Sequence, residues 1–408
     1  MKTQVLTFLF LISTSSLFAQ AWWETVEKNE QERSGGILLK RMEVQIEATE
    51  ALNAMYGYNF PEAQREFGYL RAKYPEHPLP YFLFGLAEWW KIVPNTDNTM
   101  YDAKCEAFMD QAIEKAEKMF AHGGPEEVEA SFFLATAYAF KSRLYAERKK
   151  WFKASGAGKS ALKYFEKCKG HEDFSPEMAF GEGLYNYYRQ WIPENYSALK
   201  PIFWFFHDGD KSKGIGQLEW ISRNAFYTRT EAQYFLLQIY STEQQHEKCY
   251  QLARYLHITY PWNPYFHRMY ARQCFVTGRT KEAEAAAKLI LERYDNKQFG
   301  YEPVGARYAS YILAYYNHFF YHNFALAKEY YTKTVLFAEI NGAKDSGYNL
   351  SSLLNLGKIT EHEGNLDEAK QYYDKVMDYA ERKSSQYQEA KKLLAENRKK
   401  AKAKKKGK

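Results

Sequence analysis

Small and apolar residues recur along this chain at the spacing of an α-helix. Five segments begin with a small residue, followed by a small or apolar residue four positions later and a third after three or four more. The opening small residues are Ala63, Cys249, Ala283, Ala327 and Ala369. Because residues three and four positions apart share a helix face, each segment predicts a helix with a narrow stripe that a neighbouring helix can approach closely.

A second apolar segment precedes each stripe, so helices are expected in pairs. Eight pairs are predicted to begin near residues 38, 79, 125, 176, 229, 263, 302 and 347, and a final helix from about Ser384. Strands are not expected, because no alternating β-branched run occurs and the helix formers Ala, Glu, Lys and Leu dominate. The pattern therefore predicts an all-α protein.

The first helix of a pair carries large, large and small residues at a fixed spacing. These residues are Leu353, Leu356 and Gly357 in one helix, and Tyr81, Phe84 and Gly85 in another. Here the chain resembles the tetratricopeptide-repeat family. The resemblance implies a right-handed superhelical solenoid of about eight helical hairpins with a concave face and a C-terminal capping helix.

The repeats are individually irregular. Cys249 and Ala283 are 34 residues apart, which is the tetratricopeptide period, whereas the following stripes are 44 and 42 residues apart. Tyr315 stands where the family has a small residue, and several units lack the closing proline that Pro75 and Pro261 supply. Longer helices or loops and altered local packing are expected in these units.

The N-terminus has the composition of an export signal. Lys2 gives a basic start, Val5–Phe18 is an apolar run with Ser and Thr, and Ala19-Gln20-Ala21 offers small residues at cleavage spacing. The run is shorter than the roughly 20 apolar residues that a spanning helix needs. Residues 1–21 are therefore predicted to be a signal peptide, residues 22–37 a lead-in and residues 38–383 the repeat array, in a periplasmic or secreted protein.

Charge is concentrated at the C-terminus. Residues 391–408 contain ten Lys or Arg and one Glu, a net charge of +9, whereas the whole chain carries +6. Residues 384–408 are predicted to be a capping helix followed by a basic tail that is disordered or a frayed helix end. The tail is either merely solvated or binds an anionic membrane or glycan. Nucleic acid is not expected as a partner of an exported protein.

The segment of residues 191–210 is predicted to be an insertion within the fourth pair. Pro193 and Pro201 are expected to break helix continuity, and aromatic residues are dense. The aromatic side chains in and just before this insertion include Tyr188, Trp191, Trp204 and Phe205. They either fill the core at a change of curvature or form a docking site for a partner, a ligand or a membrane interface.

The surrounding stretch is also similar to a segment of the tetratricopeptide repeat protein 39 family. That family is associated with the outer mitochondrial membrane, a location that an export signal contradicts. The resemblance therefore implies the helical fold and nothing of that family's biology. The residues that carry it are Gly181, Gly183, Pro193, Gly209, Asp210 and Gly214.

Candidate catalytic and metal-binding residues have simpler structural interpretations. Gly158-Lys159-Ser160 ends like a phosphate-binding loop, but Lys153 occupies the place of the first glycine, and Ser155–Gly158 is interpreted as a turn between helices. His318 and His322, four apart on one predicted helix, could share a metal, but no carboxylate lies one turn further in register. No enzymatic activity, metal or cofactor is therefore expected.

Four cysteines are spread singly through the chain, which excludes paired zinc or CxxC spacing. Cys249 and Cys274 are predicted on helices that pack side by side. They also occupy small-residue positions of the repeat, where a buried thiol serves as well as alanine. A disulfide and two free thiols are both compatible with this placement.

The leading hypothesis is an exported scaffold that binds an extended or helical segment of a protein partner in its concave groove. The groove is predicted to be lined by first-helix side chains, namely Tyr234, Arg268, Arg272, Tyr316 and Phe320. The alternative is an envelope-surface protein that binds anionic lipid or glycan through the basic tail and the aromatic insertion. An enzyme with a site built on the repeats is a third, less favoured hypothesis.

Overall fold

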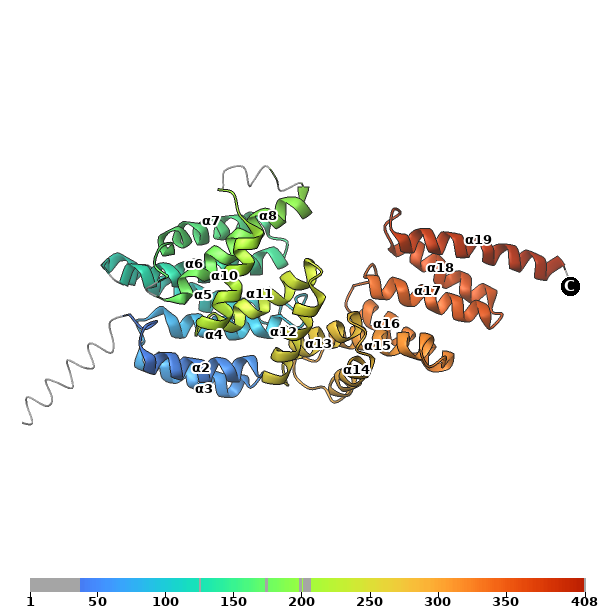
Figure 1. Cartoon of the computed structure of the whole chain (residues 1–408), viewed down its shortest axis with the longest axis horizontal. Coiled ribbons are helices and arrows are strands. Elements are labelled where there is room, and N and C mark those ends of the chain that lie inside the picture. Colours follow the sequence, from blue (N-terminus) through green and yellow to red (C-terminus); the bar gives the residue numbers. More distant parts are fainter. Residues whose placement is uncertain (1–36, 125, 173–174, 198–199, 201–206, 407–408) are drawn as a thin grey trace, which may run out of the picture. The chain divides into compact units, whose positions relative to one another are not determined.

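The computed structural model describes residues 37–124, 126–172, 175–197, 200 and 207–406. Within these residues the chain is all-helical, with 17 α-helices, one short 3-10 helix and no strand (Figure 1). The predicted signal peptide, Trp204 and Phe205 lie outside the described residues. The helices follow one another as packed pairs, which is the architecture of a tetratricopeptide-like solenoid.

Two compact units divide the chain. The first comprises the described residues up to Met55, Asn59–Trp89 and Asp102–Ala232, and the second comprises Tyr56–Tyr58, Trp90–Tyr101 and Gln233 onward. The helices with most of their residues in the first unit are α2 (Met42–Tyr56), α3 (Phe60–Lys73), α4 (Pro78–Ile92), α5 (Asp102–His122), α6 (Glu126–Glu147), α7 (Trp151–Cys168), α8 (Ala179–Asn195) and α10 (Lys211–Asn224). Those of the second are α11 (Arg229–Thr242), α12 (His246–Thr259), α13 (Pro264–Val276), α14 (Thr280–Asp295), α15 (Pro303–Phe319), α16 (Phe324–Ile340), α17 (Gly347–His362), α18 (Leu366–Tyr379) and α19 (Ser385–Lys406).

A buried carboxylate organises the backbone of the first unit. Glu177, which is 1% exposed, accepts hydrogen bonds from the backbone N–H groups of Phe226 at 2.7 Å, Tyr227 at 3.1 Å and Thr228 at 2.9 Å. The Thr228 hydroxyl donates to the same carboxylate. Burial raises the pKa of Glu177, and the four hydrogen bonds oppose that rise. The carboxylate thus satisfies the donors of the chain that enters α11.

Glycines allow close helix contact within this unit. A Cβ atom on Gly214 of α10 would lie 2.7 Å from the carbonyl oxygen of Gly183 in α8 and 2.7 Å from the backbone nitrogen of Tyr187. A Cβ on Gly209 would lie 2.6 Å from the carbonyl oxygen of Asn186. These separations are too short for a side chain, so α8 and α10 pack backbone against backbone.

Two sequence interpretations in this unit are corrected by the structure. Ser155–Gly158 is not a turn, because α7 runs unbroken from Trp151 to Cys168. Gly158 faces α6, where a Cβ would lie 3.2 Å from Oγ of Ser142, so its small size serves helix packing. Pro193 does not end α8, which continues to Asn195; a proline in the last turn removes a hydrogen bond but does not prevent two further helical residues.

In the second unit every helix from α12 to α19 packs on the next one in sequence. The first helices of successive pairs also contact each other, α13 with α15, α15 with α17, and α17 with α19. The first helices therefore form one continuous layer of this unit.

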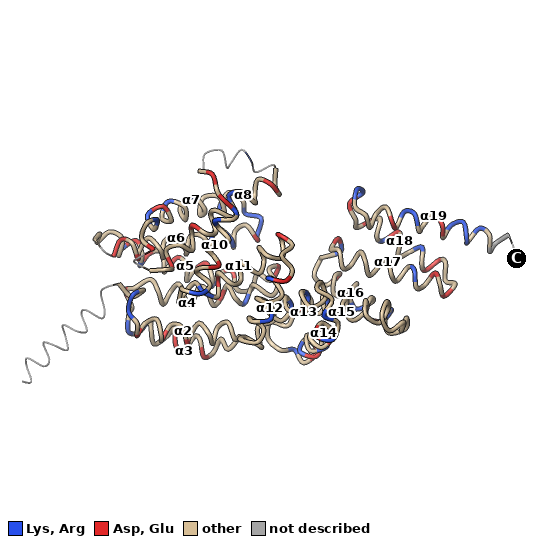
Figure 2. Tube along the Cα trace, viewed as in Figure 1, with Lys and Arg blue, Asp and Glu red and all other residues tan. Residues whose placement is uncertain are grey.

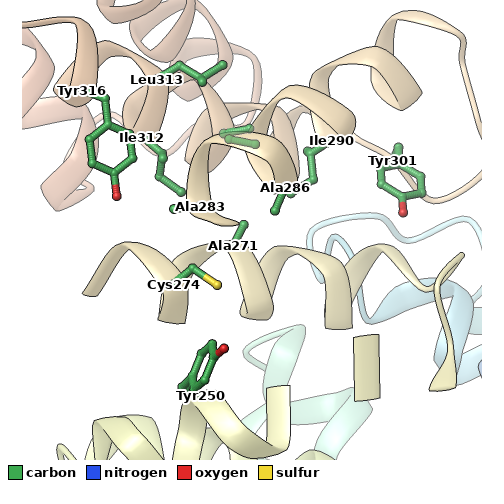
Figure 3. Close-up of a cluster of buried hydrophobic side chains, with 12 residues drawn as sticks. Tyr250, Ala271, Cys274, Ala283, Ala286, Ile290, Tyr301, Ile312, Leu313 and Tyr316 are labelled. Carbon is green, nitrogen blue, oxygen red and sulfur yellow. The ribbon is translucent and has the colours of Figure 1, made fainter. Parts of the chain in front are cut away.

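The core of the second unit is built from small side chains facing aromatic ones. One cluster is shown in Figure 3 and comprises Tyr250, Ala271, Cys274, Ala283, Ala286, Ala287, Ile290, Tyr301, Ala309, Ile312, Leu313 and Tyr316. All five small residues that open the predicted stripes are fully buried. A Cβ on Gly357 would lie 2.4 Å from Cε1 of buried Tyr373, so the small residue at this position makes room for the tyrosine of the next helix.

Tyr315 stands at the expected small position because the repeat is shifted by one residue along α15. Residues 320–323 connect α15 to α16, one residue more than residues 363–365, which connect α17 to α18. The small position accordingly falls on Ala314, which is fully buried beside Ala327, and not on Tyr315, which is half-buried. Tyr315 packs its ring against Phe275 at a centroid distance of 5.0 Å.

The basic C-terminus is a helix over most of its length. The last helix, α19, extends to Lys406, and Lys and Arg are prominent along it in Figure 2. Nδ2 of buried Asn397 donates to the carbonyl oxygen of Leu366 at 3.1 Å, and Nζ of Lys400 lies 2.7 Å from a carboxylate oxygen of Glu361. The helix is therefore attached to α17 and α18 at least as far as Lys400.

Candidate functional site

A solvent-open cavity lies between the first helices of the second unit. Its volume is about 190 Å³. Residues of α13, α15 and the start of α17 line it, namely Arg272, Arg307, Tyr308, Ser346, Gly347 and Tyr348. The cavity lies on the first-helix layer, where the concave face was predicted.

The positions of the cationic side chains follow from a repeated helix start. Pro264 and Pro303 are the first residues of α13 and α15, which suits proline because the first helical N–H needs no partner within the helix. Arg268 and Arg307 each follow their proline by four residues, and Arg272 lies one turn beyond Arg268. The three guanidinium groups therefore lie on equivalent faces of neighbouring helices.

Arg268 and Arg272 are half-buried and held by neutral groups. Nη1 of Arg268 donates to the carbonyl oxygen of Pro94 at 2.7 Å, and its guanidinium carbon lies 5.8 Å from the ring centroid of Tyr308. Nη1 of Arg272 donates to Oγ of Ser241 at 3.2 Å. Burial raises the pKa of Tyr348, and the nearby charge of Arg272 opposes that rise.

Arg307 is the most deeply buried charge of the cavity wall. It is 8% exposed, and neither Nε nor Nη1 has a hydrogen-bond partner among the described residues. Burial lowers the pKa of Arg307, and Arg268 adds to that effect, whereas Tyr308 and exposed Asp345 oppose it. Within the described part of the chain, none of the three arginines forms an ion pair. Since arginine keeps its proton in proteins, the cavity is permanently cationic.

The start of α17 adds further donors to the cavity. Its N-cap residue, Ser346, makes no side-chain capping bond, and its Oγ is buried without a partner in the described part of the chain. The first N–H groups of a helix lack intrahelical acceptors and carry partial positive charge. Because Gly347 and Tyr348 are the first residues of α17 and line the cavity, this end of the helix reinforces its positive potential.

The groove residues predicted from sequence fall in different environments. Arg268 and Arg272 lie beside the cavity, whereas Tyr234 is buried against Trp90 and Tyr265. Tyr316 is 2% exposed within the core cluster of Figure 3. Phe320 follows the end of α15 and is 58% exposed.

Sequence reasoning missed Arg307, Tyr308 and Tyr348. The available signal was the repeated spacing between a helix-opening proline and an arginine, which pairs Arg307 with Arg268. The start of α17 offered no comparable signal, because a serine N-cap is common and the absence of a capping bond is visible only in three dimensions.

The predicted aromatic insertion is only partly described. Tyr188 and Trp191 lie on α8 with ring centroids 6.0 Å apart in an edge-on arrangement, and both are half-buried. Trp191 also contacts exposed Tyr196 at 5.9 Å. A docking role for these residues stays a prediction.

The two histidines considered as metal ligands do not share a helix. His318 is in the last turn of α15, whereas His322 lies beyond its end with a φ angle of 53°. Nδ1 of His318 lies 3.3 Å from the Tyr331 hydroxyl. In the described residues no three His, Cys, Asp or Glu side chains gather in a way that could hold a metal ion.

All four cysteines are free and buried, including Cys249 and Cys274. Burial raises the pKa of each thiol to about 12. Sγ of Cys249 lies 3.4 Å from the carbonyl oxygen of Leu237, to which it can donate. Thiols with such pKa values are poor nucleophiles and serve as packing groups.

Among the described residues of 37–406, no helix is long and apolar enough to cross a bilayer.

Comparison with known proteins yields distant structural likenesses. No family model and no curated protein matches the chain. Similar solved structures include a human IFIT1 dimer with PPP-AAAA, at 15% identity, covering 79% of this chain and 68% of that chain with a TM-score of 0.39. The TPR domain of P58(IPK) is 14% identical, covering 89% of this chain and 99% of that chain with a TM-score of 0.28.

The Naa15/Naa10 complex bound to HypK-THB gives 13% identity, covering 93% of this chain and 63% of that chain with a TM-score of 0.24. At these scores the likenesses carry no inference about partner or activity. The paired-helix architecture is established by the structure itself, while membership of the tetratricopeptide-repeat family and the likeness to its protein 39 members stay predictions.

Proposed function

We propose that this protein is an exported scaffold that binds a segment of a protein partner on the first-helix layer of α13, α15 and α17, without catalysing a reaction. The observation that carries the proposal is the set of three arginines on this layer, none of which has an ionic partner among the described residues. Tyr308 and Tyr348 lie between them and provide flat, amphipathic contact surface.

Charge complementarity defines the partner segment. Arginine and tyrosine are enriched at protein interfaces, and an uncompensated cationic layer favours an acidic segment over a neutral or basic one. An extended or helical segment lying along α13, α15 and α17 would contact each of these three helical pairs once.

Site-specific photo-crosslinking in the native cell tests the proposal. A photoreactive residue at Tyr348 should crosslink to a discrete partner, whereas the same residue at Ala285, which is exposed on the second helix α14, should not. Recovery of the same adducts from both positions, or of none from Tyr348, would contradict the proposed binding face.

Export is tested separately. N-terminal sequencing of the protein from the cell envelope or medium should give a mature chain that begins near Trp22. A chain that retains Met1 and stays in the cytoplasm would exclude this part of the proposal.

A second candidate function, binding to an anionic envelope surface, is favoured by α19. Nine Lys or Arg residues between Lys391 and Lys406 lie on this single helix. Liposome sedimentation tests it: deletion of residues 402–408 should weaken binding to anionic vesicles, and added salt should weaken it further. The deletion spares Asn397 and Lys400, which hold the helix in place.

A further inference from the structure

We propose that the cavity between α13, α15 and α17 is a binding site for a phosphoryl group, either free phosphate or a phosphate monoester. Where a partner carries the group, the inference rests on the proposed function. The site itself needs no partner, because free phosphate is small enough to enter alone.

The first argument is the buried charge of Arg307, whose guanidinium carbon lies 5.5 Å from the ring centroid of Tyr308 but which forms no ion pair among the described residues. Burying a guanidinium costs free energy that an ion pair or a full set of hydrogen bonds normally offsets. Here Nε and Nη1 have no partner among the described residues, and Asp345, an acid whose charge favours the protonated form of Arg307, is exposed to solvent. A bound anion supplies the missing acceptors.

The second argument is that donors converge from three separate helices. Arg272 comes from α13, Arg307 from α15, and the uncapped N-terminus of α17 brings the N–H groups of Gly347 and Tyr348. The Ser346 hydroxyl is buried beside them, and no described residue bonds to it. An anion at a helix N-terminus that also contacts arginine gains both charge-assisted hydrogen bonds and the favourable end of the helix dipole.

The third argument concerns the shape of the ligand. A carboxylate presents two oxygens in one plane, whereas a phosphoryl group presents three acceptor oxygens and about two negative charges. Donors that arrive from three helices match the second arrangement better. The cavity of about 190 Å³ is large enough to admit a phosphoryl group.

Isothermal titration calorimetry of the full mature chain with inorganic phosphate, at constant ionic strength, tests the site. We expect saturable one-to-one binding. Loss of one charge-assisted contact should weaken it about tenfold or more, so Arg272→Gln and Arg307→Met are the test variants. Lys281→Gln, which removes the same charge from an exposed position on α14, should leave the dissociation constant unchanged within about twofold.

The same titration with other ligands shows whether the bound phosphoryl group is free phosphate or part of a monoester. Tighter binding of glycerol 3-phosphate than of phosphate would assign the site to a monoester, and the reverse order would assign it to free phosphate. Acetate should bind at least about tenfold more weakly than either. Acetate that binds as tightly as phosphate overturns the phosphoryl assignment.

Folding defects are separated from binding defects by circular dichroism and by Ser346→Ala, a small change that should weaken phosphate binding only a fewfold. Absence of saturable binding, or equal losses in Arg272→Gln and Lys281→Gln, refutes the site. Phosphate binding without crosslinks at Tyr348 would contradict the proposed scaffold and leave this inference standing. Crosslinks at Tyr348 without phosphate binding would refute the phosphoryl site and leave the proposed scaffold standing.

Discussion

Glu177 in the first unit and Arg307 in the second are both buried charges, 1% and 8% exposed, yet their surroundings differ completely. Glu177 accepts hydrogen bonds from three consecutive backbone N–H groups and a hydroxyl. Arg307 lines a cavity, and two of its nitrogens have no partner among the described residues. Glu177 therefore stabilises the fold, whereas Arg307 has donor groups that a ligand can engage.

The largest expected loss of stability comes from substituting Glu177, whose carboxylate accepts four hydrogen bonds. Glu177→Gln replaces one acceptor oxygen with an NH₂ group that faces backbone donors, so the free energy of unfolding should fall by about 3 kcal/mol. Urea denaturation measures it. Glu166→Gln is the control, because its ion pair with Lys169 is exposed and should contribute less than about 0.5 kcal/mol. Equal losses would show that Glu177 is not organising the backbone.

His257 is a third buried ionisable group, and it differs from Glu177 and Arg307 because it is neutral in the folded protein at pH 7. Burial lowers its pKa to about 4, and the charge of Arg293 adds to this effect. The unfolded chain, with a histidine pKa of about 6.5, therefore binds more protons between pH 6.5 and 4. Stability should be complete above pH 6.5 and fall as the pH drops, by about 2 kcal/mol at pH 5.

Denaturation at pH 7, 6 and 5 measures this dependence. Burial also lowers the pKa of nearby His267, which acts in the same direction. His257→Gln should therefore reduce the dependence of stability on pH without abolishing it. An unchanged slope in the variant would show that His257 titrates normally in the folded protein.

The backbone contact between α8 and α10 gives the next largest effect. Gly214→Ala places a Cβ 2.7 Å from backbone atoms of α8, which cannot move cheaply, so stability should fall by about 2 kcal/mol. Gly216→Ala in the same helix has nothing within 4 Å of its Cβ among the described residues. It should stabilise by up to about 1 kcal/mol through helix propensity. Thermal denaturation of both variants decides whether packing or propensity dominates there.

The smallest effect on stability should come from Arg307. Without ligand, Arg307→Met removes an uncompensated buried charge, so stability should be unchanged or rise by up to about 1 kcal/mol. Urea denaturation in phosphate-free buffer measures this. A loss comparable to that of Glu177→Gln would mean that Arg307 is structurally satisfied, and the contrast between the two charges would fail.

The helices were largely predictable from sequence because close packing requires small residues at regular positions. The predicted starts near residues 229, 263 and 347 lie at or next to those of α11, α13 and α17. The interpretation of Tyr315 failed because one extra loop residue shifts the small position to Ala314, and loop length is not fixed by composition. The number and hand of the repeats stay predictions.

The candidate site was less predictable because it is defined by missing partners. Arg268 and Arg272 were named from their place on a first helix, but nothing in the chain marks Arg307 as unpaired. Glu177 likewise could not be recognised, since its acceptor role depends on backbone groups about fifty residues later. Sequence patterns report which residues can pack, whereas satisfied and unsatisfied buried charges depend on the assembled structure.

Chemical labelling of the four buried thiols can measure local unfolding of the native protein. Cys105 and Cys168 belong to the first unit, and Cys249 and Cys274 to the second. A thiol reagent can label each one only when its helix pair opens, so labelling rates followed by peptide mass spectrometry give an opening free energy for each unit. A cysteine introduced on the surface can also carry a fluorophore selectively, with all four native thiols left in place.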